Sequence, residues 1–399
     1  MLKSLIAVLA LGVALAGYPI EAKASGDTKV TLTASKPIQS GIEVSLYSKV
    51  LNEQRKLLIH LPEGYEQSPQ QTYPVLLTLD GQTHFKHMSG TVDWLSESAA
   101  RIPRLIVVAL TNTNRGRDMT ASHNNGGGDL FIQFIANELI PFLNDEYRTK
   151  PFRILAGHSM AGHLALNVLE QKPELFNAYI AMSPFFHQDR GERKLAEVLA
   201  NKVSKPEFAN RFLYLSIGDE IRLKPKYDVL VDALSAKANP SLNWYSKTSN
   251  TDSHMSIVSN TVNEALQFVF APQGLSPDSE TAKAGVESIK AYYKKLSNEK
   301  YGYEISPEGA INRLGYHWLW EGNTKKAIAI FEANTKEFPS SPNVYDSLAE
   351  AYQRDKKLEL ALATIHRAIA LGEAQKLESV RWMKRREQRI KDALSSVNE

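Results

Sequence analysis

Ser159 is the residue of this chain whose neighbours best suit it to covalent chemistry. It lies in Gly157-His-Ser-Met-Ala-Gly162, after an apolar run typical of a buried strand (152–156) and before apolar residues at helical spacing (161–169). A serine on a tight turn from strand to helix is the nucleophile-elbow arrangement, which needs small neighbours because the turn is strained. The helix also directs its positive N-terminal end at the serine, which helps to stabilise an oxyanion. The pattern predicts Ser159 as a nucleophile, although Ala161 stands where the usual motif has a second glycine.

A serine hydroxyl is a weak nucleophile at its own pKa, so Ser159 needs a base. In a chain with the order serine, acid, histidine, the base follows the acid. Four histidines lie well downstream, namely His187, His254, His317 and His366. The first comes too early to follow an acid on a later strand, and the last two fall within expected repeat helices. His254, in a loop between the last expected strand and a helix, is the predicted base.

The acid that would orient this histidine is expected at the end of the strand 212–217, where two carboxylates follow one another. A carboxylate there would fix the tautomer of the His254 ring and stabilise its imidazolium form. Asp219 is the first choice and Glu220 the second. Asp252 is a third candidate, and a dyad without an acid stays open.

A second oxyanion donor is expected from the loop after the strand 73–79. That strand is followed by Asp80-Gly-Gln82, where Gly81 lets the backbone turn inward. The backbone N–H groups of Gln82 and Met160 would then both donate hydrogen bonds to the oxyanion.

The elements that must position these residues alternate between strands and helices, which indicates a largely parallel sheet covered on both faces. Strand-like runs cover residues 30–33, 42–46, 56–60, 73–79, 105–110, 152–156, 178–182, 212–217 and 244–247. Helices are expected at 131–143, interrupted late by Pro141, and near 193–203, 226–237 and 257–270. An α/β-hydrolase sheet fits this order. The predicted fold class is therefore α/β, followed by an all-α region.

The N-terminal segment, residues 1–24, has the pattern of a signal peptide: Lys3, an apolar run at 5–16, and Ala22-Lys-Ala24 as a cleavage signal. The alternative is a retained anchor, but the apolar run is too short to span a membrane. We therefore expect a periplasmic or secreted protein with no stable membrane anchor.

The chain has no cysteine, which excludes disulfides, thiolate metal sites and a lipid-modified N-terminal cysteine. Its net charge of +3 does not suggest a nucleic-acid partner.

The C-terminal part carries a repeat. Residues 272–280 are expected to form a linker between an α/β-hydrolase domain at 25–271 and a helical domain at 281–399. Positions there recur at the interval of 34 residues that is typical of tetratricopeptide repeats. One copy has Leu314, Gly315, Trp318, Ala327, Phe331 and Pro339, and the next has Leu348, Tyr352, Ala361, Ile365 and Ala368. Only two copies are clear, so flanking helices near 281–298 and 374–394 must complete the stack, which could bind a protein partner.

Several runs, taken together, resemble one family. They are residues 48–65, 73–81, 114–120, 138–141, 157–160 and 183–184. Over about residues 40–270 they resemble the putative-esterase family of α/β hydrolases, and within it the branch of trilactone siderophore esterases. The resemblance implies Ser159 and His254 as the catalytic pair, Asp80 in the oxyanion loop, and Arg115 to Asp118 lining the substrate cleft. We also expect a small-molecule ester substrate and no cofactor.

One departure concerns the pocket. Phe185-Phe-His187 stands where relatives often carry a Trp-containing loop, and Phe185 is expected to border the substrate. The identity of the ester therefore stays open.

Other polar groups have simpler interpretations. His84 and His87 are three positions apart, but no third ligand cluster accompanies them, so no metal site is predicted. His158 and His163 flank the serine and are interpreted as packing or rim residues. The glycine-rich run 124–128 lacks the lysine of a phosphate-binding loop and is interpreted as a rim loop.

The arginines after residue 114 have two interpretations of equal weight. Arg115 and Arg117 could pair with Asp118, or they could bind an acidic group of a substrate.

The sequence therefore predicts an exported serine esterase. One alternative is a decayed hydrolase that binds proteins through its helical repeats, and another is an acyltransferase or peptidase with the same triad. The presence of the serine, the histidine and both oxyanion segments argues against decay.

Overall fold

The computed structural model describes residues 39–120, 126–186 and 194–398. The expected signal peptide at 1–24, the strand expected at 30–33, His187 and residues 124–125 of the glycine-rich run lie outside the described residues. All the elements below belong to one compact unit, residues 40–399.

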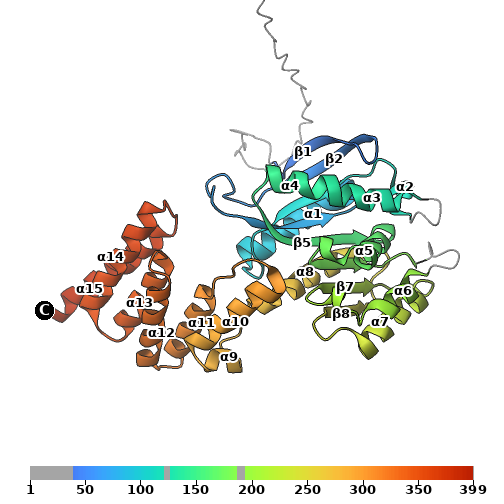
Figure 1. Cartoon of the computed structure of the whole chain (residues 1–399). Helices are drawn as coiled ribbons and strands as arrows, with labels where there is room; N and C mark the ends of the chain where they lie inside the picture. Colours follow the sequence, from blue (N-terminus) through green and yellow to red (C-terminus); the bar gives the residue numbers. More distant parts are fainter. Residues whose placement is uncertain (1–38, 121–125, 187–193, 399) are drawn as a thin grey trace, which may run out of the picture. The chain divides into compact units, whose positions relative to one another are not determined.

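An eight-stranded sheet forms the core of the part of this unit that ends with α8 (Ile257–Phe270) (Figure 1). Its strands are β1 (Ile42–Ser48), β2 (Glu53–His60), β3 (Tyr73–Thr78), β4 (Ile106–Leu110), β5 (Thr149–His158), β6 (Ala178–Met182), β7 (Phe212–Ile217) and β8 (Asn243–Thr248). The spatial order is β1-β2-β4-β3-β5-β6-β7-β8. The β1–β2 and β2–β4 pairs are antiparallel, and every other pair is parallel. The predicted α/β class with a mostly parallel sheet is confirmed.

Helices cover both faces of the sheet, because alternate residues of a strand point to opposite sides. Val75 and Leu77 of β3 belong to one core, whereas Leu76 belongs to the other. The first core packs against α3 (Gly128–Phe134), the π-helical turn η3 (Ile135–Leu139), α4 (Ile140–Glu146), α5 (Met160–Gln171), α6 (Leu195–Lys202) and α7 (Lys224–Lys237). The second packs against α1 (Gly81–Asp93), η1 (Trp94–Ser98) and α8 (Ile257–Phe270). Shorter elements are α2 (Arg115–Met119), η4 (Pro173–Leu175), η6 (Pro206–Phe208) and η7 (Ala271–Gln273).

The helix expected at 131–143 keeps a helical backbone through Pro141, and its irregular turn lies earlier, at 135–139. The π-helical turn η3 separates α3 from α4, and Pro141 lies in the first turn of α4. Proline has no N–H to donate to the preceding turn, so the first turn of a helix tolerates it.

The chain after α8 is helical. Its elements are α9 (Glu280–Lys283), α10 (Val286–Leu296), η8 (Ser297–Tyr301), α11 (Glu308–Trp320), α12 (Thr324–Glu337), α13 (Pro342–Arg354), α14 (Leu358–Ala374) and α15 (Val380–Asn398). The starts of α11 and α13, and those of α12 and α14, are each 34 residues apart. Gly315 permits α11 to approach α12, because a Cβ at that position would lie 2.4 Å from the Phe331 ring.

One tyrosine joins this helical part to the core of the sheet. Tyr301 is fully buried, and its hydroxyl donates to the Val269 carbonyl oxygen at 2.7 Å. Its ring centroid lies 5.0 Å from that of Phe152 and 5.7 Å from that of Phe212. The first helices after the sheet domain therefore share its hydrophobic core.

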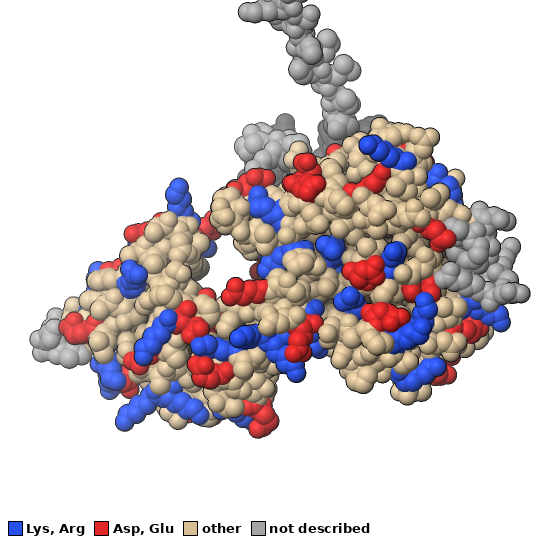
Figure 2. Space-filling view, in the orientation of Figure 1, with Lys and Arg blue, Asp and Glu red and all other residues tan. Residues whose placement is uncertain are grey.

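Charged side chains of both signs are interspersed over the face shown in Figure 2. Among the helices described, none combines the length and the apolar composition needed to cross a membrane.

Candidate active site

Ser159 occupies a strained turn between β5 and α5. Its backbone has φ 60° and ψ −118°, a conformation that a residue other than glycine rarely adopts. Hydrogen bonds fix this turn: the Ser159 N–H donates to the Met182 carbonyl oxygen (2.9 Å), and the Phe185 N–H donates to the Ser159 carbonyl oxygen (3.0 Å). The serine therefore stands at the carboxyl end of the sheet, where the sequence pattern places it.

Small residues beside Ser159 are required by close backbone approaches. A Cβ on Gly157 would lie 2.2 Å from the Ala161 carbonyl oxygen, and a Cβ on Gly162 would lie 3.0 Å from that of Met182. Ala161 itself is fully buried, so the turn accommodates a methyl group where the usual motif has glycine.

His254 lies beside Ser159, and its partner is Glu220. The Nδ1 atom of His254 is 2.9 Å from Oε2 of Glu220, and Ser183 Oγ donates to the other carboxylate oxygen at 2.7 Å. Burial alone would raise the pKa of Glu220, but the hydrogen bonds from His254 and Ser183 leave it below its ordinary value. A carboxylate only accepts, so Nδ1 carries the proton and Nε2 is the basic nitrogen of the neutral ring.

Asp219 and Asp252 have other contacts. The backbone N–H of Asp219 donates to the Asp252 carbonyl oxygen at 2.8 Å, which ties the turn after β7 to the loop that carries His254. The Asp252 carboxylate accepts from Ser249 Oγ (2.7 Å) and Ser256 Oγ (3.0 Å) within its own loop. Of the three carboxylates considered from the sequence, the structure brings Glu220 to the histidine, and not the first choice, Asp219.

The expected oxyanion donors are the first backbone N–H groups of two helices. Asp80 adopts the left-handed conformation just before α1, and the Thr83 and His84 N–H groups both donate to its carbonyl oxygen. Gly81 and Gln82 precede Thr83, whose N–H is the first to donate to the Asp80 carbonyl oxygen, and Met160 precedes His163, whose N–H donates to the Ser159 carbonyl oxygen. The N–H groups of Gly81, Gln82 and Met160 therefore have no acceptor within their own helices. A Cβ on Gly81 would lie 2.7 Å from the Ala109 carbonyl carbon, which explains the glycine.

Asp80 is held by the loop after β4. Arg115 donates through Nε and Nη2 to its two carboxylate oxygens (2.7 and 2.8 Å), and Asn112 Nδ2 donates to the first at 2.6 Å. Burial alone would raise the pKa of Asp80, but these hydrogen bonds hold it below its ordinary value. The Asn112 N–H also donates to Gln82 Oε1 at 3.2 Å, so this loop fixes the start of α1.

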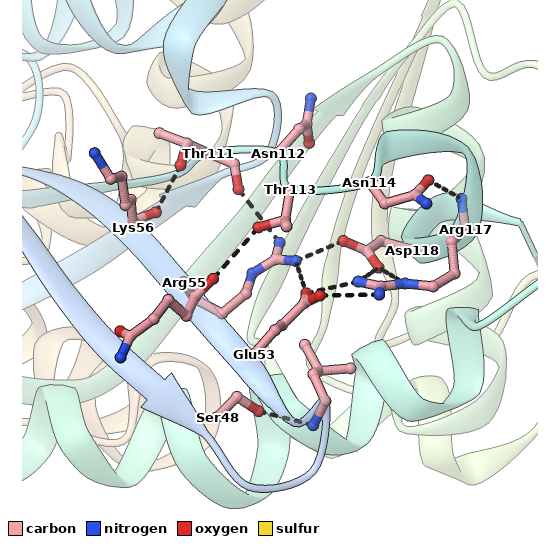
Figure 3. A network of polar contacts seen from close by, with 12 residues as sticks. Ser48, Glu53, Arg55, Lys56, Thr111, Asn112, Thr113, Asn114, Arg117 and Asp118 are labelled. Atoms are coloured by element: carbon pink, nitrogen blue, oxygen red, sulfur yellow. Dashed lines mark hydrogen bonds and ion pairs between the residues drawn. The ribbon is translucent and has the colours of Figure 1, made fainter.

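Asp118 does not line the substrate cleft, contrary to the expectation from the family resemblance. It is 1% exposed, and both of its oxygens accept from guanidinium groups: Arg55 Nη1 at 2.7 Å and Arg117 Nε at 2.7 Å. Glu53 accepts from the same two arginines (Figure 3). Arg117 therefore belongs to a partly buried ion cluster that supports the loop 111–118, whereas Arg115 borders the cavity beside Ser159.

Two cavities meet at Ser159 and His254. The larger, of about 750 Å³, is also lined by Phe185, Asp219, Glu220, Ile221, Arg222 and Leu223. The smaller, of about 290 Å³, is also lined by Asp80, Gln82, Thr83, His84, Arg115, His158 and Met255. An ester carbonyl at Ser159 would thus have a wall of mixed apolar and charged side chains on one side and mostly polar groups on the other. Phe185 borders the larger cavity, as expected.

Histidines outside the expected pair also surround the site. His84 Nδ1 lies 2.8 Å from His87 Nε2, and within residues 39–120, 126–186 and 194–398 no group of three or more His, Asp or Glu side chains could hold a metal ion. His158, interpreted from the sequence as a packing or rim residue, is buried and contacts the loop of His254.

Sequence reasoning missed Ser183 and Asn112. Ser183 has a positive φ of 41° and follows the buried strand β6, so a polar residue at the carboxyl end of that strand was the available signal. Asn112 stands at the corresponding place after β4, but its sequence neighbours do not distinguish it from an ordinary loop residue.

The chain also resembles known proteins in sequence and in fold. Residues 48–273 match the sequence model of the family described as "Putative esterase". Among characterised sequences, the chain is 29% identical over 175 residues to the ferri-bacillibactin esterase BesA of Bacillus subtilis, covering 38% of this chain and 60% of BesA. It is 32% identical over 149 residues to the uncharacterised protein YjcH of the same organism, covering 36% of this chain and 61% of YjcH. The chain thus spans about 60% of the length of these two relatives.

Solved structures extend the likeness. An IroE-like serine hydrolase from Shewanella oneidensis superposes with a TM-score of 0.62 at 25% identity, over 75% of this chain and 99% of that protein. An uncharacterised protein from Capnocytophaga ochracea superposes with a TM-score of 0.61 at 18% identity, over 86% of this chain and 99% of that protein. The second match shows likeness of fold alone, and its coverage reaches beyond the sheet into the helices that follow it.

Proposed function

Because this chain belongs to the putative esterase family, we propose that it is a serine hydrolase that cleaves carboxylic esters. The observation that carries the proposal is the contact of His254 with Glu220 at 2.9 Å, in a cavity that the strained Ser159 also lines. Acid, base and nucleophile come from three different loops at one end of the sheet. Their convergence is the arrangement that nucleophilic catalysis by serine requires.

In the proposed reaction, Ser159 Oγ attacks the ester carbonyl carbon while His254 Nε2 takes its proton. Glu220 holds the imidazolium that forms, and the N–H groups of Met160 and Gln82 stabilise the oxyanion. The intermediate collapses, His254 returns the proton to the leaving alcohol, and an acyl-serine remains. Water then attacks the acyl group by the same route in reverse, which releases the acid and restores Ser159.

The ester is proposed to be of the siderophore type or another natural product with a similar body. Support comes from the relatives, since BesA is named a ferri-bacillibactin esterase and a short match (39% over 61 residues) is a siderophore triacetylfusarinine C esterase of Aspergillus fumigatus. The larger cavity offers Phe185 and Leu223 to an apolar group, and Ile221 stands 85% exposed at its side.

A panel of esters tests this proposal. The purified protein should hydrolyse short-chain nitrophenyl esters, and its kcat/KM should be highest for a trilactone siderophore among trilactone, feruloyl and acetylated-sugar substrates. Ser159→Ala serves as the matched blank. Hydrolysis of no ester in the panel would contradict the esterase proposal, whereas a preference for another ester would redirect only the substrate.

For the helical part, we propose a tetratricopeptide-like array that limits access to the site or binds a protein partner. The interval of 34 residues between helix pairs supports this proposal.

We also propose export, on the basis of the pattern in residues 1–24. Mass spectrometry of the N-terminus after expression in a host with a secretion pathway tests the second proposal, since cleavage after Ala24 is expected.

A further inference from the structure

One buried histidine connects the nucleophile turn to the loop of the base. His158 is the last residue of β5 and immediately precedes Ser159. Its Nε2 atom lies 2.7 Å from the main-chain carbonyl oxygen of His254. A carbonyl oxygen only accepts, so Nε2 is the donor.

The ring of His158 also contacts the ring of His254. Their centroids are 4.5 Å apart with an angle of 45° between the planes. The His84 ring also packs edge-on against His158, with 6.0 Å between the ring centroids. His84 belongs to α1, the helix that begins with the expected oxyanion donors. His158 therefore lies between the three segments that carry the base, the nucleophile and the second oxyanion group.

The base needs such support because its own side chain is open to solvent. The His254 side chain is 36% exposed, and Glu220 is its ion-pair partner. The contacts with Glu220 and with the Asp219 N–H tie the loop of His254 to the turn after β7, but neither ties it to the turn of Ser159. The hydrogen bond from His158 fixes the main chain of that loop directly against the nucleophile turn.

We propose that His158 is a positioning residue, which holds His254 at the correct distance from Ser159 through its hydrogen bond to the His254 carbonyl oxygen. The proposal rests on the proposed serine mechanism and assigns a new role within it. Burial lowers the pKa of His158 to about 4, and the nearby His254 adds to this effect. The ring is therefore neutral at neutral pH, and its single proton is available for this hydrogen bond.

The length of the side chain gives a sharp test. The amide nitrogen of glutamine reaches about as far as Nε2 of histidine, whereas that of asparagine reaches about as far as Nδ1. His158→Gln should therefore keep the hydrogen bond and His158→Asn should lose it, although both introduce the same amide group. His158→Phe keeps the ring and removes the donor. His60→Gln is the matched control, because His60 contacts Ser40 and Asp93 away from the cavity.

The measurement is kcat and KM for a nitrophenyl ester, with the rate of inactivation by a fluorophosphonate as a second readout. A misplacement of about 1 Å can cost on the order of 100-fold in rate, so we expect kcat of His158→Asn and His158→Phe to fall about 10- to 100-fold with KM nearly unchanged. His158→Gln should stay within about threefold of the wild type, and the fluorophosphonate rates should follow the same order.

The outcomes separate this inference from the proposed function. Turnover by the wild type and its loss in Ser159→Ala decide the serine mechanism, independently of His158. Equal kcat for the glutamine and asparagine variants, whether high or low, would overturn the positioning role. If His158→Phe fails to fold by circular dichroism, the comparison of the two amide variants still decides.

Discussion

Glu220 Oε2 lies 2.9 Å from His254 Nδ1, whereas its neighbour Asp219 uses its backbone N–H to hold the loop of the same histidine. The two adjacent acids thus do different things. Glu220 can orient the imidazole and stabilise its positive charge, and Asp219 fixes the loop through a main-chain contact that survives a change of side chain.

This difference predicts the effect of removing each carboxylate. Glu220→Gln should lower kcat by about 10³- to 10⁴-fold, because loss of a triad acid leaves the imidazolium without its counter-charge. Asp219→Asn, which keeps the backbone contact, should stay within about threefold of the wild type. Steady-state kinetics on a nitrophenyl ester compare the two. A larger loss in Asp219→Asn than in Glu220→Gln would reverse the assignment.

The buried histidines predict a loss of stability in mild acid. Burial lowers the pKa of His84 and of His158 to about 4, from about 6.5 in an unfolded chain. Between these values the unfolded chain binds more protons than the folded chain, so the free energy of unfolding falls as the pH is lowered from about 6.5 to about 4. The contribution of the neutral histidines to stability is fully present above pH 6.5. Each ring contributes on the order of 3 kcal/mol to this fall.

Urea unfolding at pH 7.5 and pH 4.5 tests this linkage with a variant that cannot take up the proton. His84→Gln should lose less stability than the wild type between the two pH values, whatever its stability at pH 7.5. An identical loss in both proteins would show that His84 does not contribute to the acid sensitivity.

The ion cluster of Arg55, Asp118, Glu53 and Arg117 predicts a large effect of one buried charge. Asp118→Asn leaves Arg55, which is fully buried, with one acidic partner fewer, and should lower the free energy of unfolding by about 3 kcal/mol. Lys56→Ala removes the exposed pair with Glu43 on the same hairpin (59% and 52% exposed) and should cost less than about 1 kcal/mol. If Asp118→Asn and Lys56→Ala unfolded at the same urea concentration, the ion cluster would not stabilise the fold more than the exposed pair does.

The packing of Tyr301 predicts where the chain can be shortened. A chain of residues 25–271 uncovers Phe152, Phe212 and Phe270, which contact Tyr301, and should be less soluble and melt at a lower temperature. A chain of residues 25–306 keeps Tyr301 and should avoid this loss. Both should hydrolyse a small nitrophenyl ester when folded, since every residue of the two cavities at Ser159 precedes Ile257. A folded but inactive 25–306 chain would place part of the catalytic machinery in the later helices.

Much of the fold was predictable because it depends on local patterns. The buried strands are continuous apolar runs, and the nucleophile turn requires small residues at fixed positions around Ser159, so both leave a signal in the sequence. His254 could be selected by its place in a loop after the last strand.

The choice between Asp219 and Glu220 was not predictable from type or spacing. Both follow β7, and the side chain that meets His254 is decided by the turn from Gly218 onward, where a Cβ on the glycine would lie 2.5 Å from the Asp252 carbonyl oxygen. The burial of Asp118 was likewise not predictable from its sequence neighbours. Its burial depends on its ion pair with Arg55, which is 63 residues away in sequence, and a local sequence pattern does not predict such a contact.

The central claim is that Ser159 is the nucleophile and that His254 activates it. Reaction with a fluorophosphonate followed by peptide mass spectrometry tests this most directly. We expect one adduct, on the peptide that contains Ser159, no adduct in Ser159→Ala, and a labelling rate at least about 100-fold lower in His254→Ala. Labelling of Ser159→Ala at the wild-type rate, or an adduct on another residue of the wild type, would contradict the account.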